Sequence, residues 1–233
     1  MSSDDRRNDK GAEALSRILR AIRGPAALAF SYQAEDAAAL HLLLGCGGAG
    51  VEVFTLNTNR LFPETAAYHR EVELFFNIPI HQYYPEAEEE EKLEAELGEW
   101  GMRESLEKRR RCCEVRKVRP LARILAGKNA WVTGLRAAQS VTRSDLKLLE
   151  YDEQFGLVKI NPLADWSDED LAAYIERYRI PLNPLYAEGF KSIGCAPCTR
   201  AVREGEDIRS GRWWWELPDH KECGLHARRA AGG

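Results

Sequence analysis

Residues 26–44, AALAFSYQAEDAAALHLLL, and residues 51–77, VEVFTLNTNRLFPETAAYHREVELFFN, decide the fold. Each stretch opens with a short apolar run, passes through a polar loop and ends where apolar residues recur with helical spacing. Strands that alternate with helices in this way form βαβ units, so the two stretches predict a parallel sheet flanked by helices. Ligands of such sheets bind beyond the carboxyl ends of the strands.

The same alternation continues through the rest of the chain. We expect helices over 12–22, 34–44, 63–77, 86–97, 111–126 and 167–178. We expect strands over 26–31, 51–56, 78–84, 130–134 and 158–160, the last on a small hairpin. The loops SYQAED, TLNTNRLFPET and TGLRAAQSVTR each come directly after a strand, so the sequence predicts that they share one rim of the sheet.

Composition limits the class of protein. The 233 residues are 44% apolar and 30% charged, which is typical of a globular protein with a sizeable core. The net charge of −4 argues against a generic nucleic-acid partner, and no apolar run approaches the roughly 20 residues that span a bilayer. The polar N-terminus lacks the pattern of a secretory signal, so we expect a cytoplasmic protein without a membrane partner.

Changes in composition divide the chain into three regions. Residues 1–11 are polar, charged and without periodicity, and we expect them to be disordered. Residues 12–202 make up the expected α/β domain. The next stretch is basic and Trp-rich, and residues 203–233 are expected to form a C-terminal tail that folds onto this domain or swings over it.

Four of the six cysteines form two pairs. Cys112 and Cys113 are adjacent, and Cys195 and Cys198 form a CxxC. Disulfides are rare in the cytoplasm, so metal binding or thiol chemistry is the expected use of these residues. Four thiolates can hold one [4Fe–4S] cluster or a structural zinc ion. Zinc sites usually combine two CxxC-like pairs, so the spacing favours the cluster, and zinc stays the alternative.

Basic residues surround the adjacent cysteine pair in the run KRRRCCEVRKVR (108–119). A solvated helix face is one interpretation of such a run. The other is that these cations offset the negative charge of the thiolates. Lys117 lies four residues after Cys113, which places the two side chains one helical turn apart on the same face.

Cys223 stands apart from the pairs, in the segment KECGLH. Lys221 and His226 flank it, and nearby cations lower the pKa of a thiol and populate its nucleophilic thiolate. A surface cysteine without a role is the alternative interpretation. Cys46 has no partner pattern, and we interpret it as a small buried hydrophobic residue.

Taken together, these segments resemble the assimilatory adenylylsulfate (APS) reductases, the iron–sulfur branch of the phosphoadenylylsulfate (PAPS) reductase family. The matching segments are SYQAED (31–36), RLFPET (60–65), RRCCEVRKVRPL (110–121), TGLRAAQSVTR (133–143), the stretch 183–216 and ECGLH (222–226). The resemblance implies an adenine nucleotide α-hydrolase-like (ATP-pyrophosphatase-like) fold. Relatives with that fold carry a phosphate loop SGGxDS, whereas this chain has SYQAED, which fits a substrate that is already activated.

Two short departures from the family pattern concern the predicted nucleotide loops. The family commonly shows LDTGRL and TGLRR, where this chain has LNTNRL (56–61) and TGLRA (133–137). Asn tolerates a left-handed backbone turn nearly as Gly does, so the turn at Asn59 is expected to survive. Ala137 removes one cation, and Arg136 remains.

The resemblance implies thioredoxin-dependent reduction of APS to sulfite and AMP through a covalent sulfonate on Cys223, in assimilatory sulfate reduction. It also implies one [4Fe–4S] cluster on the four paired cysteines, which would make residues 12–202 a nucleotide- and cluster-binding domain. His226 would support the Cys223 thiolate or the docked tail. The cations expected around the anionic phosphosulfate are Lys117, Arg136, Arg209, Arg212 and Arg143. The residues expected to line the nucleotide site are Ser31, Gln33, Glu35, Leu56 and Thr58.

Four alternatives stay open at this point. A PAPS reductase, or an enzyme with dual APS and PAPS activity, would use the same thiol chemistry. An ATP-dependent thiolase or adenylating enzyme would share the fold, but the missing SGGxDS argues against it. A zinc-stabilised binding module without enzyme activity would leave ECGLH unexplained. The sequence is also compatible with a homo-oligomer.

Overall fold

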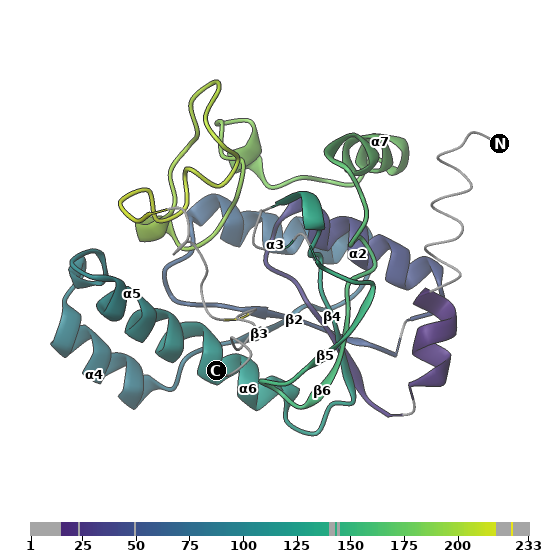
Figure 1. The fold of residues 1–233 in the computed structure, drawn as a ribbon, viewed down its shortest axis with the longest axis horizontal. Coiled ribbons are helices and arrows are strands. Elements are labelled where there is room, and N and C mark those ends of the chain that lie inside the picture. Colours follow the sequence, from purple (N-terminus) through teal and green to yellow (C-terminus); the bar gives the residue numbers. More distant parts are fainter. Residues whose placement is uncertain are drawn as a thin grey trace.

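The computed structural model describes residues 15–22, 24–48, 50–139, 143, 145–217 and 225. Within them the chain forms a six-stranded sheet in the order β3-β2-β1-β4-β6-β5 (Figure 1). The strands are β1 (Ala26–Ala29), β2 (Glu52–Leu56), β3 (His81–Tyr83), β4 (Ala130–Val132), β5 (Leu149–Asp152) and β6 (Leu157–Ile160). All neighbouring pairs are parallel except β5 and β6, which form an antiparallel hairpin. The predicted parallel sheet and its terminal hairpin are confirmed.

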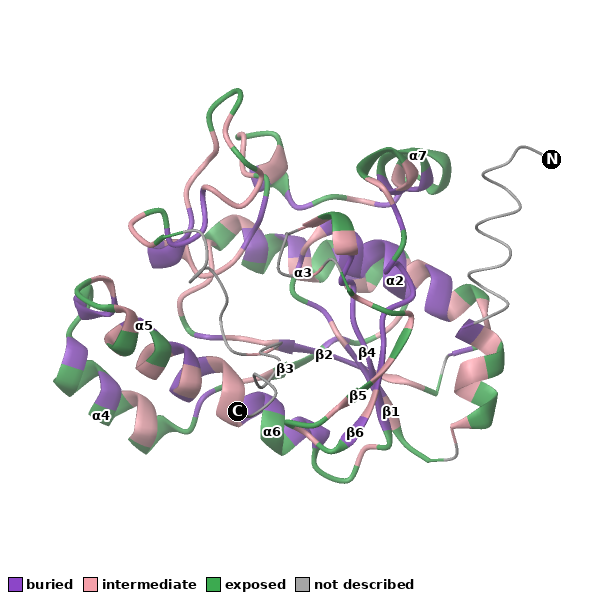
Figure 2. Ribbon diagram, in the orientation of Figure 1, coloured by how far each residue is buried: buried purple, intermediate pink, exposed green. Residues whose placement is uncertain are grey.

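Helices cover both faces of this sheet (Figure 1). They are α2 (Ala34–Gly45), α3 (Pro63–Phe76), α4 (Ala87–Leu97), α5 (Leu106–Cys113), α6 (Arg119–Leu125) and α7 (Asp168–Tyr178), with a further helix over residues 15–21. Successive strand residues face opposite layers. Leu28 packs in the core that includes α2, α3 and α7, while its neighbour Ala27 packs with α6. Figure 2 shows the resulting band of buried residues along the central strands.

Two helix boundaries have clear local causes. The capping box predicted at α7 is present, because the Ser167 hydroxyl accepts from Asp170 N and the Asp170 carboxylate accepts from Ser167 N. The predicted helix over 111–126 starts too late. The helical run begins at Leu106, because the Ser105 side chain caps it by accepting from Lys108 N.

The middle of that helical run departs from the expected spacing. Between α5 and α6 the residues Glu114–Val118 form a π-helical segment. π-helical segments are rare in proteins, and many of those that occur lie at functional sites. The run therefore carries Cys112, Cys113 and Lys117 across a local widening rather than along a regular α-helix. No helix in the described part of the chain is long and apolar enough to cross a membrane.

Candidate active site

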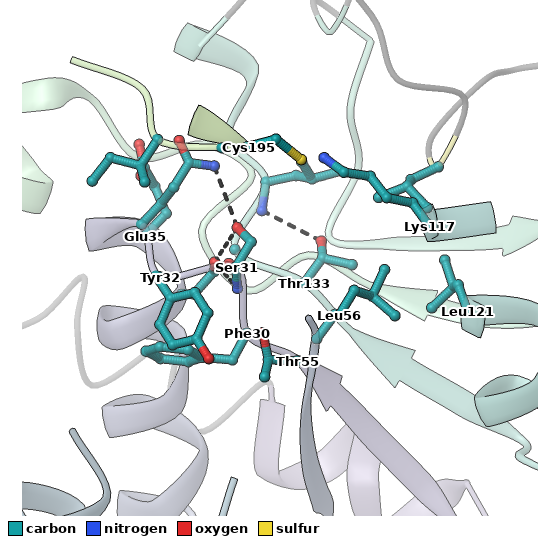
Figure 3. Close-up of a pocket in the computed structure, with 18 of the residues that line it drawn as sticks. Phe30, Ser31, Tyr32, Glu35, Thr55, Leu56, Lys117, Leu121, Thr133 and Cys195 are labelled. Carbon is teal, nitrogen blue, oxygen red and sulfur yellow. Dashed lines mark hydrogen bonds between the residues drawn. The ribbon is translucent and has the colours of Figure 1, made fainter. Parts of the chain in front are cut away.

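A large cleft opens at the carboxyl ends of β1, β2 and β4 (Figure 3). Its empty volume, including space open to solvent, is about 1030 Å³. All three predicted loops contribute to the lining, so the prediction that they share one rim of the sheet is confirmed. The predicted nucleotide-site residues in the lining are Ser31, Gln33, Glu35, Leu56, Thr58 and Arg143.

The first loop is organised by a buried carboxylate. Asp36 Oδ2 accepts from both the backbone N and the hydroxyl of Ser31, each at 2.6 Å. Burial raises the pKa of Asp36 to about 6, against the lowering effect of those hydrogen bonds. Gly134, on the third loop, lies against this carboxylate, and a Cβ there would come within 2.4 Å of Asp36 Oδ1. Glycine at 134 is therefore what lets the two loops meet.

The second loop connects the sheet to the cysteines. Asn59 has a left-handed backbone (φ 57°), as predicted for the position where the family has Gly. The Thr58 hydroxyl lies 3.3 Å from Cys195 Sγ, and Arg116 Nη1 donates to Thr58 O at 2.7 Å. Arg60 O accepts from Ala196 N at 2.8 Å. The loop thus contacts the cleft on one side and the CxxC on the other.

The four paired cysteines line a second cavity of about 410 Å³ beside the cleft. Cys112 and Cys113 end α5, and Cys195 and Cys198 bracket the 3₁₀ turn η6 (Ala196–Cys198). The cations that line it are Arg60, Arg109, Arg116, Lys117 and Arg212. In the described part of the chain, no group of three or more His, Cys, Asp and Glu side chains closes around a single metal ion. The four thiols are instead spread along the wall of one cavity.

The thiols are close enough that the charge of each one shifts the pKa of the others. Burial, followed by the charges of the other three, raises the pKa of Cys112 to about 12. Burial and the charges of Cys195 and Cys113 also raise the pKa of Cys198 to about 12. Cys195 differs. Burial again opposes its ionisation, but Lys117 together with the Thr58 hydrogen bond and two arginines outweighs burial, and the pKa lies below its usual value.

Lys117 and Cys195 line both cavities and so mark their junction. Figure 3 shows the Lys117 ammonium and the Cys195 sulfur directed toward each other at one end of the cleft. Arg212 and Trp213 also line both cavities, and Arg209 lines the cleft. Arg209 and Arg212 belong to a turn in which Arg212 N donates to Arg209 O at 2.9 Å. The turn brings both expected cations to the cleft.

The sequence of the sheet and its loops matches a known family model, the phosphoadenosine phosphosulfate reductase domain, over residues 25–201. The chain belongs to this family. A relative from Allochromatium vinosum named adenosine 5′-phosphosulfate reductase is 51% identical over 181 residues, 78% of this chain and 71% of that protein. One of the same name from Sinorhizobium fredii (strain NBRC 101917 / NGR234) is 45% identical over 214 residues, 92% of this chain and 85% of that protein.

Solved structures agree with the family assignment. Phosphoadenylyl-sulfate (PAPS) reductase from Candida auris superposes with a TM-score of 0.67 at 25% identity, covering 87% of this chain and 98% of that one. Yeast FAD synthetase superposes with a TM-score of 0.58 at 13% identity, covering 86% and 69% of the two chains, and shows a shared fold only. The expected adenine nucleotide α-hydrolase-like fold is confirmed.

One predicted substrate residue lies elsewhere in this PAPS reductase family member. Arg136 is absent from the described residues that line the cleft and is 2% exposed. Its Nη2 donates to Glu35 at 2.9 Å and to Asp168 at 2.7 Å, and its Nη1 donates to Trp166 O at 3.2 Å. Arg136 therefore braces the first and third loops against the start of α7. The prediction that it binds substrate finds no support in this geometry.

Cys223 and His226 lie outside the described residues, so their predicted roles stay predictions. Leu225 is described, and it lines the cleft and packs beside Leu121 and the core on that face. Prediction from sequence also missed three residues of the site. Asp36, Arg116 and Trp213 all lie inside segments that match the family, but only their burial in the fold distinguishes them from neighbouring residues of the same type.

Proposed function

We propose that the chain reduces APS to sulfite and AMP in assimilatory sulfate reduction, with Cys223 as nucleophile and a thioredoxin-type dithiol as reductant. The observation that carries the proposal is the junction of the two cavities at Lys117 and Cys195. A nucleotide-sized cleft at the rim of an α/β sheet there meets a cationic, cysteine-lined cavity. Relatives at 43–51% identity that carry the name adenosine 5′-phosphosulfate reductase support this choice of substrate.

The charges in the cleft suggest how the substrate is oriented. At the first loop Glu35 is paired with Arg136 and Asp36 accepts from Ser31, whereas the other end of the cleft presents Lys117, Arg209 and Arg212. The nucleoside then lies over the sheet rim, near Leu56 and Thr58, and the phosphosulfate points to the cations. Those cations offset the repulsion between an anionic thiolate and an anionic sulfate.

The proposed reaction balances with one dithiol. The Cys223 thiolate attacks the sulfate sulfur, a sulfur–sulfur bond forms, and the bond between that sulfur and the phosphate oxygen breaks with its electron pair leaving on AMP. A thiol of the reductant then attacks Cys223 Sγ and expels sulfite with the electron pair of the cleaved bond. The second thiol of the reductant resolves the mixed disulfide and restores Cys223. The dithiol becomes a disulfide and supplies both electrons.

Leu225 supports a role for Cys223 in this cleft. The described residue lines the cleft, and Cys223 is two positions earlier in the chain. Two residues span at most about 7 Å. A nucleophile at 223 is therefore within reach of the cleft, and support of its thiolate by His226 stays a prediction.

We further infer that the four paired cysteines hold one [4Fe–4S] cluster. Four neighbouring thiols, two of them buried and two half-buried, cannot ionise together without a compensating positive charge, and the donor set is that of a cluster or of zinc. Lys117 and Arg212 line the same cavity and reduce the remaining negative charge, while Arg109 and Arg116, which also line it, are paired with glutamates. When bound, the cluster would supply iron–thiolate bonds that fix α5 against η6. Both electrons come from the dithiol, so no step passes through the cluster.

We also propose that the enzyme works in the cytoplasm, where disulfides are rare and the paired cysteines stay available to a metal centre. A homo-oligomer stays a prediction, which sedimentation of the purified protein would check.

The nucleophile is tested by trapping the intermediate. Wild-type protein mixed with APS, without thioredoxin, is expected to gain one sulfonate on the peptide that contains Cys223, as measured by mass spectrometry. Reduced thioredoxin should remove that mass and release sulfite. Cys223→Ser should bind APS and release no sulfite, since a serine hydroxyl is a much weaker nucleophile at neutral pH. An adduct on Cys46, or normal turnover by the serine variant, would contradict the proposal.

The cofactor and substrate are tested separately. Anaerobically purified protein should contain four irons and four acid-labile sulfides per chain if the cluster proposal is correct. Stoichiometric zinc without sulfide would instead support the zinc alternative. Comparing kcat/KM for APS and PAPS decides between an APS reductase and a PAPS or dual-specificity enzyme, and a preference for PAPS would overturn the proposed substrate.

A further inference from the structure

A buried ion pair joins Arg109, which lines the cysteine cavity, to Glu216. Arg109 Nε donates to Glu216 Oε1, and Nη2 donates to Oε2, both at 2.8 Å. The Arg109 side chain is fully buried and that of Glu216 is 6% exposed. Such two-pronged pairs are specific in geometry, but the cost of desolvating both charges makes a buried pair weak support for stability alone. Stability alone therefore does not explain why this pair is buried here.

Arg109 links the adjacent cysteine pair to the CxxC pair. It lies on α5, where its side chain is in hydrogen-bond contact with Cys113. Its guanidinium carbon is 4.7 Å from the centre of the Trp213 ring, and Trp213 N donates to Cys198 O at 3.1 Å. The guanidinium carbon of Arg212 is 4.6 Å from the same ring centre. The Arg109 side chain thus holds residues 212–216 against the wall of the cysteine cavity.

Glu216 is placed to control the course of the C-terminal segment. It lies seven positions before Cys223. Seven residues span at most about 25 Å, so the position of Glu216 limits where Cys223 can go. Limiting the space that Cys223 can reach raises its effective concentration at the cleft, as for any group attached to a short linker. Correct placement of a reacting group in turn contributes much of the rate enhancement of an enzyme.

We propose that Arg109 and Glu216 are a pair of positioning residues, which fixes the chain at residue 216 beside the cysteine cavity and so limits the reach of Cys223. The role of Cys223 itself rests on the proposed function. The anchoring does not, because it predicts how the segment behaves whether or not APS is the substrate. The pair acts through Cys223 and touches no substrate atom.

The test uses the cluster-loaded, full-length protein and four variants. Glu216→Gln removes the ion pair, and Glu216→Asp keeps the charge with a shorter reach. The double variant R109M/E216M removes both charges together, so that neither is left buried and unpaired. Lys108→Gln is the matched control, because Lys108 is the neighbouring residue on α5 and its pair with Glu104 is exposed. Iron content and cluster absorbance are checked first, and trypsin cleavage after Lys221 is then measured over time by mass spectrometry.

Loss of the pair is expected to speed cleavage after Lys221 by about tenfold, the ratio that corresponds to losing one charged hydrogen-bonded contact. Single-turnover sulfonation of Cys223 should slow by a similar factor, lowering kcat while KM for APS stays the same. Glu216→Asp should recover part of both, and Lys108→Gln should match wild type.

Cleavage at the wild-type rate in both Glu216→Gln and the double variant would overturn the proposal. So would equal acceleration in Lys108→Gln, which would indicate a general loosening of α5. If Glu216→Gln fails to fold, the double variant and Glu216→Asp decide the question. Absence of any sulfonation in wild type would instead refute the proposed function, while the protease comparison would still test the anchoring.

Discussion

The rim of the sheet and the cysteine cavity meet at Lys117, but they are built in opposite ways. The rim is acidic, and its Glu35 and Asp36 belong to a loop and helix that come directly after β1. The cysteine cavity is cationic and combines residues 109–117 with residues 195–213, which are far apart in the chain. A site whose cations gather at one end can orient a substrate that is neutral at one end and anionic at the other.

The largest expected effect tests whether the cationic half drives the chemistry. Lys117→Ala should lower kcat/KM for APS by about 10²–10³, since one preorganised charge at a developing anion typically contributes that much. Cluster absorbance and the unfolding midpoint check that the fold survives. Arg123→Gln is the matched control, because Arg123 lies on α6 and its pair with Glu86 is exposed. Near-normal turnover in Lys117→Ala would remove Lys117 from the mechanism.

A smaller effect tests the acidic half, through the pH dependence of stability. The folded-state pKa of Asp36 is about 6, above its ordinary value of 3.8, because the carboxyl is buried. The native protein therefore binds more protons than the unfolded chain between those values. Stability from this group is fully present below pH 3.8 and is lost as pH rises through 6. The loss is about 3 kcal/mol, at 1.36 kcal/mol per pKa unit.

Asp36→Asn removes this titration. Urea unfolding from about pH 4 to about pH 7 should show that wild type loses stability relative to Asp36→Asn as the pH rises. Ser31→Ala removes a hydrogen bond to the carboxylate. The pKa of Asp36 should then rise further, and the transition should move to higher pH. Parallel stability curves for wild type and Asp36→Asn would show that Asp36 titrates normally.

The two halves also differ in how far the sequence predicts them. The rim is predictable from local patterns, because each loop comes directly after the strand that positions it. That logic predicted the shared cleft and the left-handed turn at Asn59. It did not predict the surroundings of Arg136, because sequence does not show that Glu35 and Asp168 converge on its guanidinium and leave it buried.

For the cysteine cavity, the sequence predicted which cysteines come together but not the backbone and side-chain contacts that hold them there. Residue type and spacing grouped the four cysteines, and the structure brings all four to one cavity. The π-helical segment between Cys113 and Lys117 was missed, because its residues have no distinctive apolar period. The Arg109–Glu216 pair was missed for another reason. Nothing in the sequence distinguishes Arg109 from the arginines beside it, which only tertiary packing separates into buried and exposed.

The smallest expected effect concerns Asn59, on the loop that joins the two halves. Its backbone is left-handed, and its Nδ2 donates to Glu90 Oε2 at 2.6 Å, which ties the loop to α4. Asn59→Ala should lose about 1–2 kcal/mol of unfolding free energy, since alanine tolerates the left-handed backbone less well than Asn and the hydrogen bond to Glu90 is lost as well.

Asn59→Gly separates the two contributions, because it keeps the backbone turn and loses only the bond to Glu90. It should therefore lie within about 1 kcal/mol of wild type in urea unfolding. If the loop transmits strain to the cysteines, Asn59→Ala should also alter the cluster absorbance through Thr58, which contacts Cys195. Equal destabilisation by alanine and glycine would mean that the bond to α4, rather than the turn, holds the two halves together. The residue that departs from the family pattern would then have replaced conformational freedom with a specific contact.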